Sequence, residues 1–118
     1  MDESILTSIK KMLGIVPEYT EFDSVVIIHI NSVLSILNQL GVGPSEGLII
    51  KDDKTTWSSL INDDNTLESV KSYVYVKTKI LFDPPNSSIV MDAMNRTINE
   101  LECRINIAVE TKKKGGSE

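Results

Sequence analysis

The sequence predicts an all-α protein, a small helical bundle of four main helices plus one short helix. Two long stretches, residues 23–40 and 88–110, repeat apolar side chains at the period of an amphipathic helix. Glycine and proline stand almost only between the periodic stretches, where they mark turns. A chain of 118 residues is also long enough to bury a core without a disulfide or a metal ion.

The first predicted helix is short and covers residues 4–13. Asp2 or Ser4 can cap it, because a side-chain oxygen at that position accepts a hydrogen bond from a free backbone N–H. Gly14 is typical of the position just beyond a helix C-terminus, and Pro17 cannot continue the helix.

The second predicted helix covers residues 23–40, with Asp23 as its N-cap and Gly41 at its end. Its polar residues are mostly small and uncharged, which suits close packing, so we expect this helix to be central. Polar residues interrupt the apolar ones too often for a membrane span. The side chains expected on its buried face are Phe22, Val26, Ile30, Val33, Leu37 and Leu40, widened by Val25, Ile28 and Ile36.

Residues 41–56 break the helical pattern with three glycines and a proline, which predicts an exposed loop. Residues 48–50 could form a short strand or hairpin there, ended by Asp52 and Asp53. Loops of this length are usually functional or disordered. A short helix or turn is predicted to follow over residues 56–61.

The next predicted helix covers residues 67–82, with Thr66 as its cap. It ends at Asp83, because a residue before proline is disfavoured in the α region. The side chains expected on its buried face are Leu67, Val70, Val74 and Leu81, with Tyr73 and Ile80 beside them.

The last predicted helix follows the two prolines and is capped by Asn86, Ser87 or Ser88. One side of it forms a continuous apolar seam: Met91, Met94, Ile98, Leu101, Ile105 and Ala108. The polar residues 111–118 that follow are predicted to be a disordered tail, so the predicted domain is residues 1–110.

A second side of the last helix carries charges that alternate in sign every four residues: Asp92, Arg96, Glu100 and Arg104. We call these four residues the charge ladder. Such a pattern is typical of a solvated face, but the same charges could set the register of a subunit interface. With Asp52 and Asp53 of the loop, the ladder is the candidate subunit or partner interface.

The composition excludes several functions. The formal net charge is −5 and the only basic cluster is residues 112–114, which argues against tight non-specific binding of nucleic acid. With one histidine and one cysteine, the chain offers no recognisable zinc site or nucleophile–base arrangement. His29 has the spacing of a core histidine, and Cys103 that of an ordinary helix residue. We therefore predict no enzyme activity, no cofactor and no metal.

Three segments together resemble a known family. They are FDSVVIIHINSVLSILNQLGVGP, LIIKDDKTTW and SVKSYVYVKTKILFDPPNSSIVMDAMNRTINELECRIN, of which VKTKILFDPP with the helix after it is the most specific. In these segments the chain resembles the head–tail connector, or head-completion adaptor, proteins of long-tailed bacteriophages and prophages. The resemblance spans about residues 3–110.

The resemblance implies a structural virion protein without catalytic residues. Connectors of this kind form a ring, typically twelve-fold, beneath the portal protein, extend the DNA channel and dock the next head-completion or tail protein. DNA passes through without sequence-specific binding, and no membrane is involved. The implied location is the head–tail junction of the virion, after assembly in the bacterial host cytoplasm.

A small helical phage regulatory or DNA-binding domain is the alternative. It would require a recognition helix with clustered lysine and arginine. Lys71, Lys77 and Lys79 are the nearest approach to one in this sequence.

Overall fold

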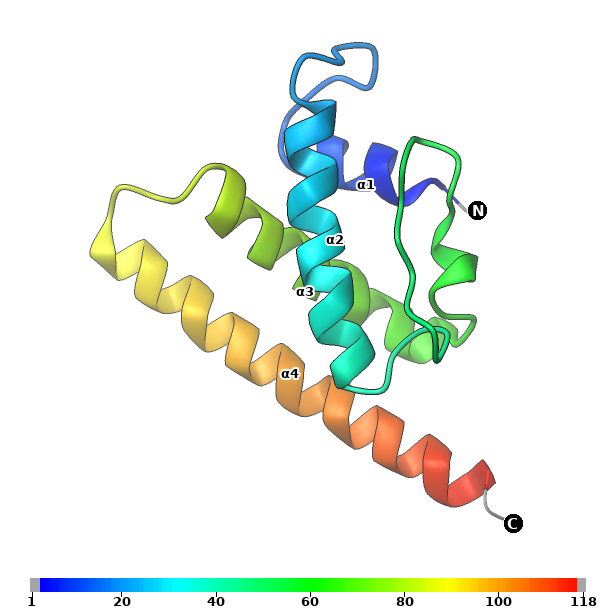
Figure 1. The fold of residues 1–118 in the computed structure, drawn as a ribbon. Helices are drawn as coiled ribbons and strands as arrows, with labels where there is room; N and C mark the ends of the chain where they lie inside the picture. Colours follow the sequence, from blue (N-terminus) through cyan, green and yellow to red (C-terminus); the bar gives the residue numbers. More distant parts are fainter. Residues whose placement is uncertain (1–2, 117–118) are drawn as a thin grey trace.

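The computed structural model describes residues 3–116, and it confirms the all-α class. The helices are α1 (Ile5–Met12), α2 (Asp23–Gln39), the 3₁₀-helix η1 (Trp57–Ser59), α3 (Asp64–Phe82) and α4 (Ser88–Gly116). Helix α3 lies at the centre, packed against α1, α2 and α4, while α2 crosses its front and α4 runs along one side (Figure 1).

The core lies between α3 and the helices around it. Trp57 and Tyr73 are its largest fully buried side chains. Three residues of the α4 seam, Ile98, Leu101 and Ile105, are buried as predicted. The remaining buried apolar side chains are Ile5, Leu6, Ile9, Val26, Ile30, Val33, Leu34, Leu37, Val42, Ile50, Leu60, Val70 and Val74.

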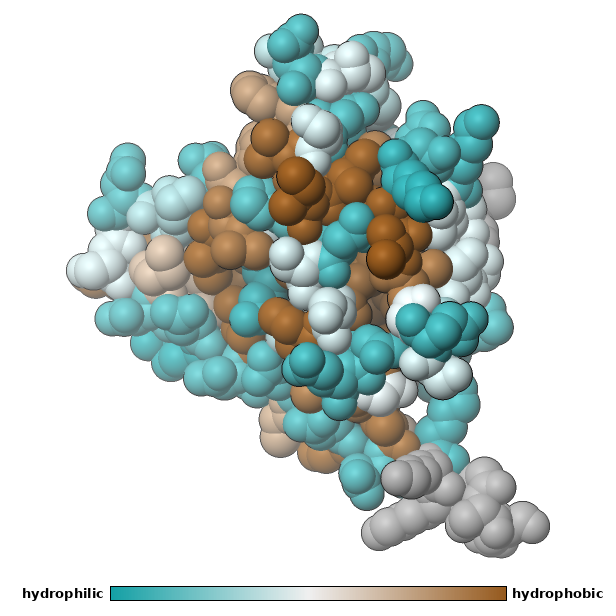
Figure 2. All heavy atoms as spheres, viewed as in Figure 1, coloured by the Kyte–Doolittle hydropathy of each residue, from teal (hydrophilic) through white to brown (hydrophobic). Residues whose placement is uncertain are grey.

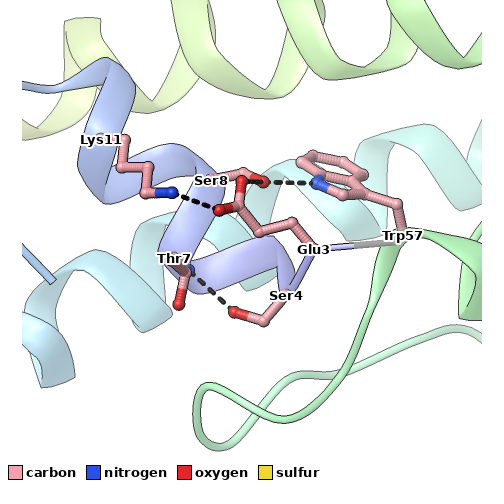
Figure 3. Close-up of polar contacts among 6 residues, drawn as sticks. All are labelled: Glu3, Ser4, Thr7, Ser8, Lys11 and Trp57. Carbon is pink, nitrogen blue, oxygen red and sulfur yellow. Dashed lines mark hydrogen bonds and ion pairs between the residues drawn. The ribbon is translucent and has the colours of Figure 1, made fainter. Parts of the chain in front are cut away.

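Helix α1 is capped by Ser4, whose Oγ accepts a hydrogen bond from Thr7 N at 2.9 Å. A chain of two hydrogen bonds ties the helix to η1: Trp57 Nε1 donates to Ser8 Oγ at 2.9 Å, and Ser8 Oγ donates to Glu3 Oε1 at 2.8 Å (Figure 3). The hydrogen bond from Lys11, followed by that from Ser8, holds the pKa of Glu3 below its ordinary value.

The C-terminal end of α1 carries a buried lysine. Lys10 is only 3% exposed, yet its ammonium has three oxygen partners. It donates to Pro17 O at 2.9 Å and to Tyr19 O at 2.7 Å, and lies 2.7 Å from Asp23 Oδ1. Two backbone carbonyls thus accept hydrogen bonds from the ammonium, and the Asp23 carboxylate balances its charge as an ion pair without forming a hydrogen bond at Oδ1. Asp23 was expected to cap α2, but it is the first residue of that helix and pairs with Lys10 instead.

The start of α3 also differs from the prediction. The helix begins at Asp64 and its cap is Asp63, whose Oδ1 accepts a hydrogen bond from Asn65 N at 3.1 Å. The predicted cap, Thr66, lies within the helix and donates its hydroxyl proton to Asp63 Oδ2 at 2.7 Å. The carboxylate occupies the capping position because it accepts from both groups.

The loop of residues 41–56 contains no strand or hairpin, and the described chain has only an isolated antiparallel bridge between Ser4 and Thr56. The side chain of Asn31 takes the place of a partner strand. Its Nδ2 donates to Ile50 O at 3.0 Å and its Oδ1 accepts from Ile50 N at 2.9 Å. The loop backbone is thus held against α2 without a second strand.

Helix α4 continues to Gly116, where the sequence predicted a disordered tail from residue 111. Residues 111–116 extend a helix that is already formed, and lysine is a good helix former. Residues 117–118 of the predicted tail lie outside the described residues. Farther back along the helix, Tyr73 of α3 donates its hydroxyl proton to Glu102 Oε2 at 2.7 Å, which links α4 to the core. Burial, and then this hydrogen bond, raise the pKa of Tyr73 above its ordinary value.

We expect the substitution Lys10→Met to destabilise the protein by about 2–3 kcal/mol. It leaves two carbonyls without their donor and the Asp23 carboxylate, whose side chain is only 27% exposed, without its counter-charge. Urea unfolding at pH 7 measures the change. The matched control is Lys11→Met, which removes a surface ion pair with Glu3 and should cost less than about 1 kcal/mol. Equal losses in the two variants would contradict a special role for the buried ammonium.

We expect Tyr73→Phe to lower the free energy of unfolding at neutral pH by about 1 kcal/mol, because a part-buried hydrogen bond is lost. The raised pKa of Tyr73 means that the folded state holds its proton more tightly than the unfolded state does. Its contribution to stability is complete below the unfolded pKa of about 10 and declines as the pH rises above that value. The difference between the two proteins should therefore shrink in alkaline solution. A constant difference up to pH 11 would speak against this linkage.

Candidate interaction surface

The charge ladder lies on the exposed side of α4 and is only partly formed. Arg104 Nη2 pairs with Glu100 Oε1, and both side chains are more than 60% exposed, at 62% and 64%. Asp92 and Arg96 are exposed too, but within residues 3–116 no ion pair joins Arg96 to Asp92 or to Glu100. Half of the ladder is therefore available to a partner.

The loop carboxylates lie apart from the ladder. Asp52 and Asp53 are exposed, and Asp52 Oδ1 accepts a hydrogen bond from Lys54 N at 2.9 Å, which shapes the turn. The loop tip is well separated from α4 (Figure 1). The six residues predicted as one candidate interface thus form two separate surfaces.

A third surface was missed by the sequence prediction. Large apolar side chains are exposed around the outer side of α2, where Figure 2 shows them as a brown area that extends onto both flanks. We call this set the α2 face. Its residues and their exposed fractions are Tyr19 (45%), Phe22 (45%), Val25 (43%), Ile28 (63%), Ile49 (68%) and Leu81 (48%).

Four of these residues were expected in the core. Phe22, Val25 and Ile28 were assigned to the buried side of the second helix and Leu81 to that of the third, and all four assignments are wrong. Phe22 instead packs edge-on against Phe82, with ring centroids 5.4 Å apart. Exposed apolar clusters of this kind mark interaction sites on soluble proteins.

The α2 face is also free of charge. The exposed positions of α2 itself are Ser24, Val25, Ile28, Ser32, Ser35 and Gln39, which include no lysine, arginine, aspartate or glutamate. In the whole chain 25% of residues are charged. The absence of charged residues on the exposed side of α2 is visible in the sequence, because a solvated helix of this length normally carries several charged residues.

A groove of about 330 Å³ lies along one side of the α2 face, between α2, α3 and α4. The half-buried His29 lines it, together with Lys77 and the exposed Leu81. The other lining residues are Ser32, Val33, Ile36, Ile80, Asn95 and Ile98. The groove is thus mostly apolar and holds no carboxylate.

The residues considered for chemistry are dispersed. His29 lines the groove, whereas Cys103 is exposed on the outer side of α4. Among the described residues no group of three histidine, cysteine, aspartate or glutamate side chains is placed to hold a metal ion. Over the same part of the chain, none of the helices has the length and apolar character that crossing a membrane requires.

The three lysines considered for DNA recognition all make internal contacts. Lys71 lies over the Trp57 ring at 5.7 Å and Lys77 over the Tyr73 ring at 5.9 Å. Lys79 pairs with Asp83 at 2.7 Å. They do not form a free basic row on one side of α3.

Comparison with known proteins agrees with this picture of a structural subunit. A family model described as "Phage connector protein" matches residues 5–112, which include all of the helices except the last four residues of α4. Searches of curated proteins and of solved structures gave no match. The matched region contains the α2 face, the loop and the charge ladder. The chain belongs to the phage connector protein family and is a structural connector protein of a bacteriophage.

Proposed function

We propose that this protein is a subunit of the head–tail connector, and that copies of it form a ring beneath the portal that extends the DNA channel. The observation that carries the proposal is the uncharged α2 face on an otherwise charged connector subunit. Such a face is costly to expose to water and is stabilised when another protein covers it. The ring also docks the next head-completion or tail protein at the virion's head–tail junction, after assembly in the host cytoplasm.

The overall charge supports passage of DNA. The chain has a net charge of −5, so a channel wall built from it repels phosphates and does not retain the DNA that slides past. Of the lysines of α3, Lys79 is paired with Asp83, which further reduces the basic surface.

The charge ladder and the loop carboxylates Asp52 and Asp53 serve as contacts to neighbours in this proposal. Exposed charges add little binding energy, but they set register and exclude wrong partners. The unpaired Arg96 and Asp92 are suited to that role, because no ion pair within the described subunit needs to break first.

Sedimentation and portal binding test the proposal. We expect the isolated protein to be a monomer or a weak oligomer, and to co-purify as a ring with the portal protein of the same virus. Analytical ultracentrifugation over a wide concentration range gives the first result, and electron microscopy of the portal complex gives the second. A tight dimer with two-fold symmetry, together with no portal binding, would overturn the proposal.

Charge reversal on the ladder should weaken ring formation and leave the subunit folded. We expect Arg96→Glu or Glu100→Lys to keep the helical circular dichroism spectrum, since both positions are exposed. Ring yield on the portal should fall several-fold, because like charges then meet at the contact. Glu18→Lys, at an exposed loop position, is the control and should assemble normally. Unchanged assembly of the ladder variants would make the ladder a solvated face.

Duplex DNA should bind weakly if the protein lines a channel. Non-specific binders typically have dissociation constants of about 1 μM or weaker at physiological salt. We therefore expect no gel shift at protein concentrations below about 1 μM. A sub-micromolar complex with duplex DNA would favour the regulatory alternative.

A further inference from the structure

Two exposed features of different shape lie on opposite sides of α2. The loop of residues 41–56 lies on one side of α2, and the last turns of α3 with the first half of α4 lie on the other (Figure 1). Ile49 belongs to that loop, and the groove lined by Leu81 lies between α2, α3 and α4. We propose that copies of this chain pack head to tail, with Ile49 of one copy seated in the groove of the next. The inference rests on the proposed function and names the contact that builds the ring.

Ile49 is presented outward by a fixed backbone. Its neighbour Ile50 is 1% exposed and is held at both its N–H and its C=O by the side chain of Asn31. Successive side chains of an extended segment point in opposite directions. Because Ile50 points into the core, Ile49 points away from it and is 68% exposed.

The groove is suited to an apolar side chain. It measures about 330 Å³, and apolar residues of three helices line it, with Leu81 48% exposed. A well-packed apolar anchor in such a pocket is typical of the residues that dominate binding energy. Ser32 of α2 also lines the groove, and its small side chain lets a second backbone approach closely.

The charges favour a second copy as the occupant. Two copies of a chain with net charge −5 repel each other wherever carboxylates meet. The groove has no carboxylate and one lysine, Lys77, whereas residues 44–54 carry three carboxylates and two lysines. A slightly negative loop therefore meets a slightly positive groove, and the loop carboxylates face no carboxylate of the groove.

This geometry gives a heterologous contact. A contact between two different surfaces leaves one of each free on every dimer, so further copies add until the rotation closes a ring. An isologous contact through the α2 face would stop at a dimer.

Mixing two defective variants tests the contact. Ile49→Asp spoils the loop and keeps the groove, whereas Leu81→Asp spoils the groove and keeps the loop. Each variant alone should lose self-association by roughly thirtyfold or more, the loss typical of a central anchor. Their equimolar mixture should form dimers and nothing larger, because each pair retains one intact loop and one intact groove. Ile89→Asp, at a 78% exposed position on α4, is the matched control and should behave like the wild type.

Disulfide trapping covers the case of weak association. In a Cys103→Ser background, chains with Ile49→Cys are mixed with chains with Leu81→Cys and oxidised. We expect mixed disulfide dimers, since a disulfide forms only when the two Cα atoms come within about 7 Å. The control pair, Ile89→Cys with Leu81→Cys, should give far fewer.

The inference is overturned if Ile49→Asp assembles normally. It is also overturned if the mixture of the two aspartate variants stays monomeric under conditions in which the wild type associates. A yield of mixed disulfide dimers no higher than that of the control pair would overturn it too. Portal binding separates this inference from the proposed function. If the wild type joins a portal ring but Ile49 and Leu81 prove irrelevant, the connector role stands and only this contact falls.

Discussion

The buried ammonium of Lys10 is the interaction on which the arrangement of the N-terminal half depends. A charge in the protein interior is costly unless it is paired with an opposite charge and hydrogen-bonded. Here its partners come from the connection between α1 and α2, at Pro17 and Tyr19, and from the first turn of α2, at Asp23. The same connection places Phe22 against Phe82 of α3. The lysine therefore determines where α2 starts and which residues its outer side presents.

The fold class and the order of helices could be predicted because they depend on short-range signals. Ser4 caps α1 by a contact three residues away, and Gly14 follows the helix with a positive φ of 85°. The structure of the loop could not be predicted. Asn31 replaces a partner strand for Ile50, a contact across nineteen residues that no local pattern encodes. At α3 the sequence predicted Thr66 as the cap, whereas the cap is Asp63, whose carboxylate accepts from both Asn65 N and Thr66 Oγ1.

The α2 face was missed for a different reason. The spacing of apolar residues predicts how wide the apolar side of a helix is, but it does not predict which part of that side the core buries. An apolar residue on the surface carries the same sequence signal as one in the core, so the spacing predicted a buried position for the exposed Val25, Ile28 and Leu81. The charge ladder was found because sign alternation is visible locally. The spacing does not predict which of its residues form an ion pair within the subunit, because neighbouring charges are always four residues apart.

The anchoring of the loop has a consequence for the thermodynamics of assembly. Its backbone is held at Pro44 by Asn38, at Ile50 by Asn31, and at Thr55 by the first residue of α1. A free loop would lose conformational entropy on binding, at a cost of about 1–2 kcal/mol for each backbone residue that becomes fixed. In this protein the loop backbone is already ordered in the folded subunit, so this entropy is lost on folding and not on binding. In the proposed loop contact, each added subunit would therefore lose mainly rigid-body freedom, and association would need no slow folding step.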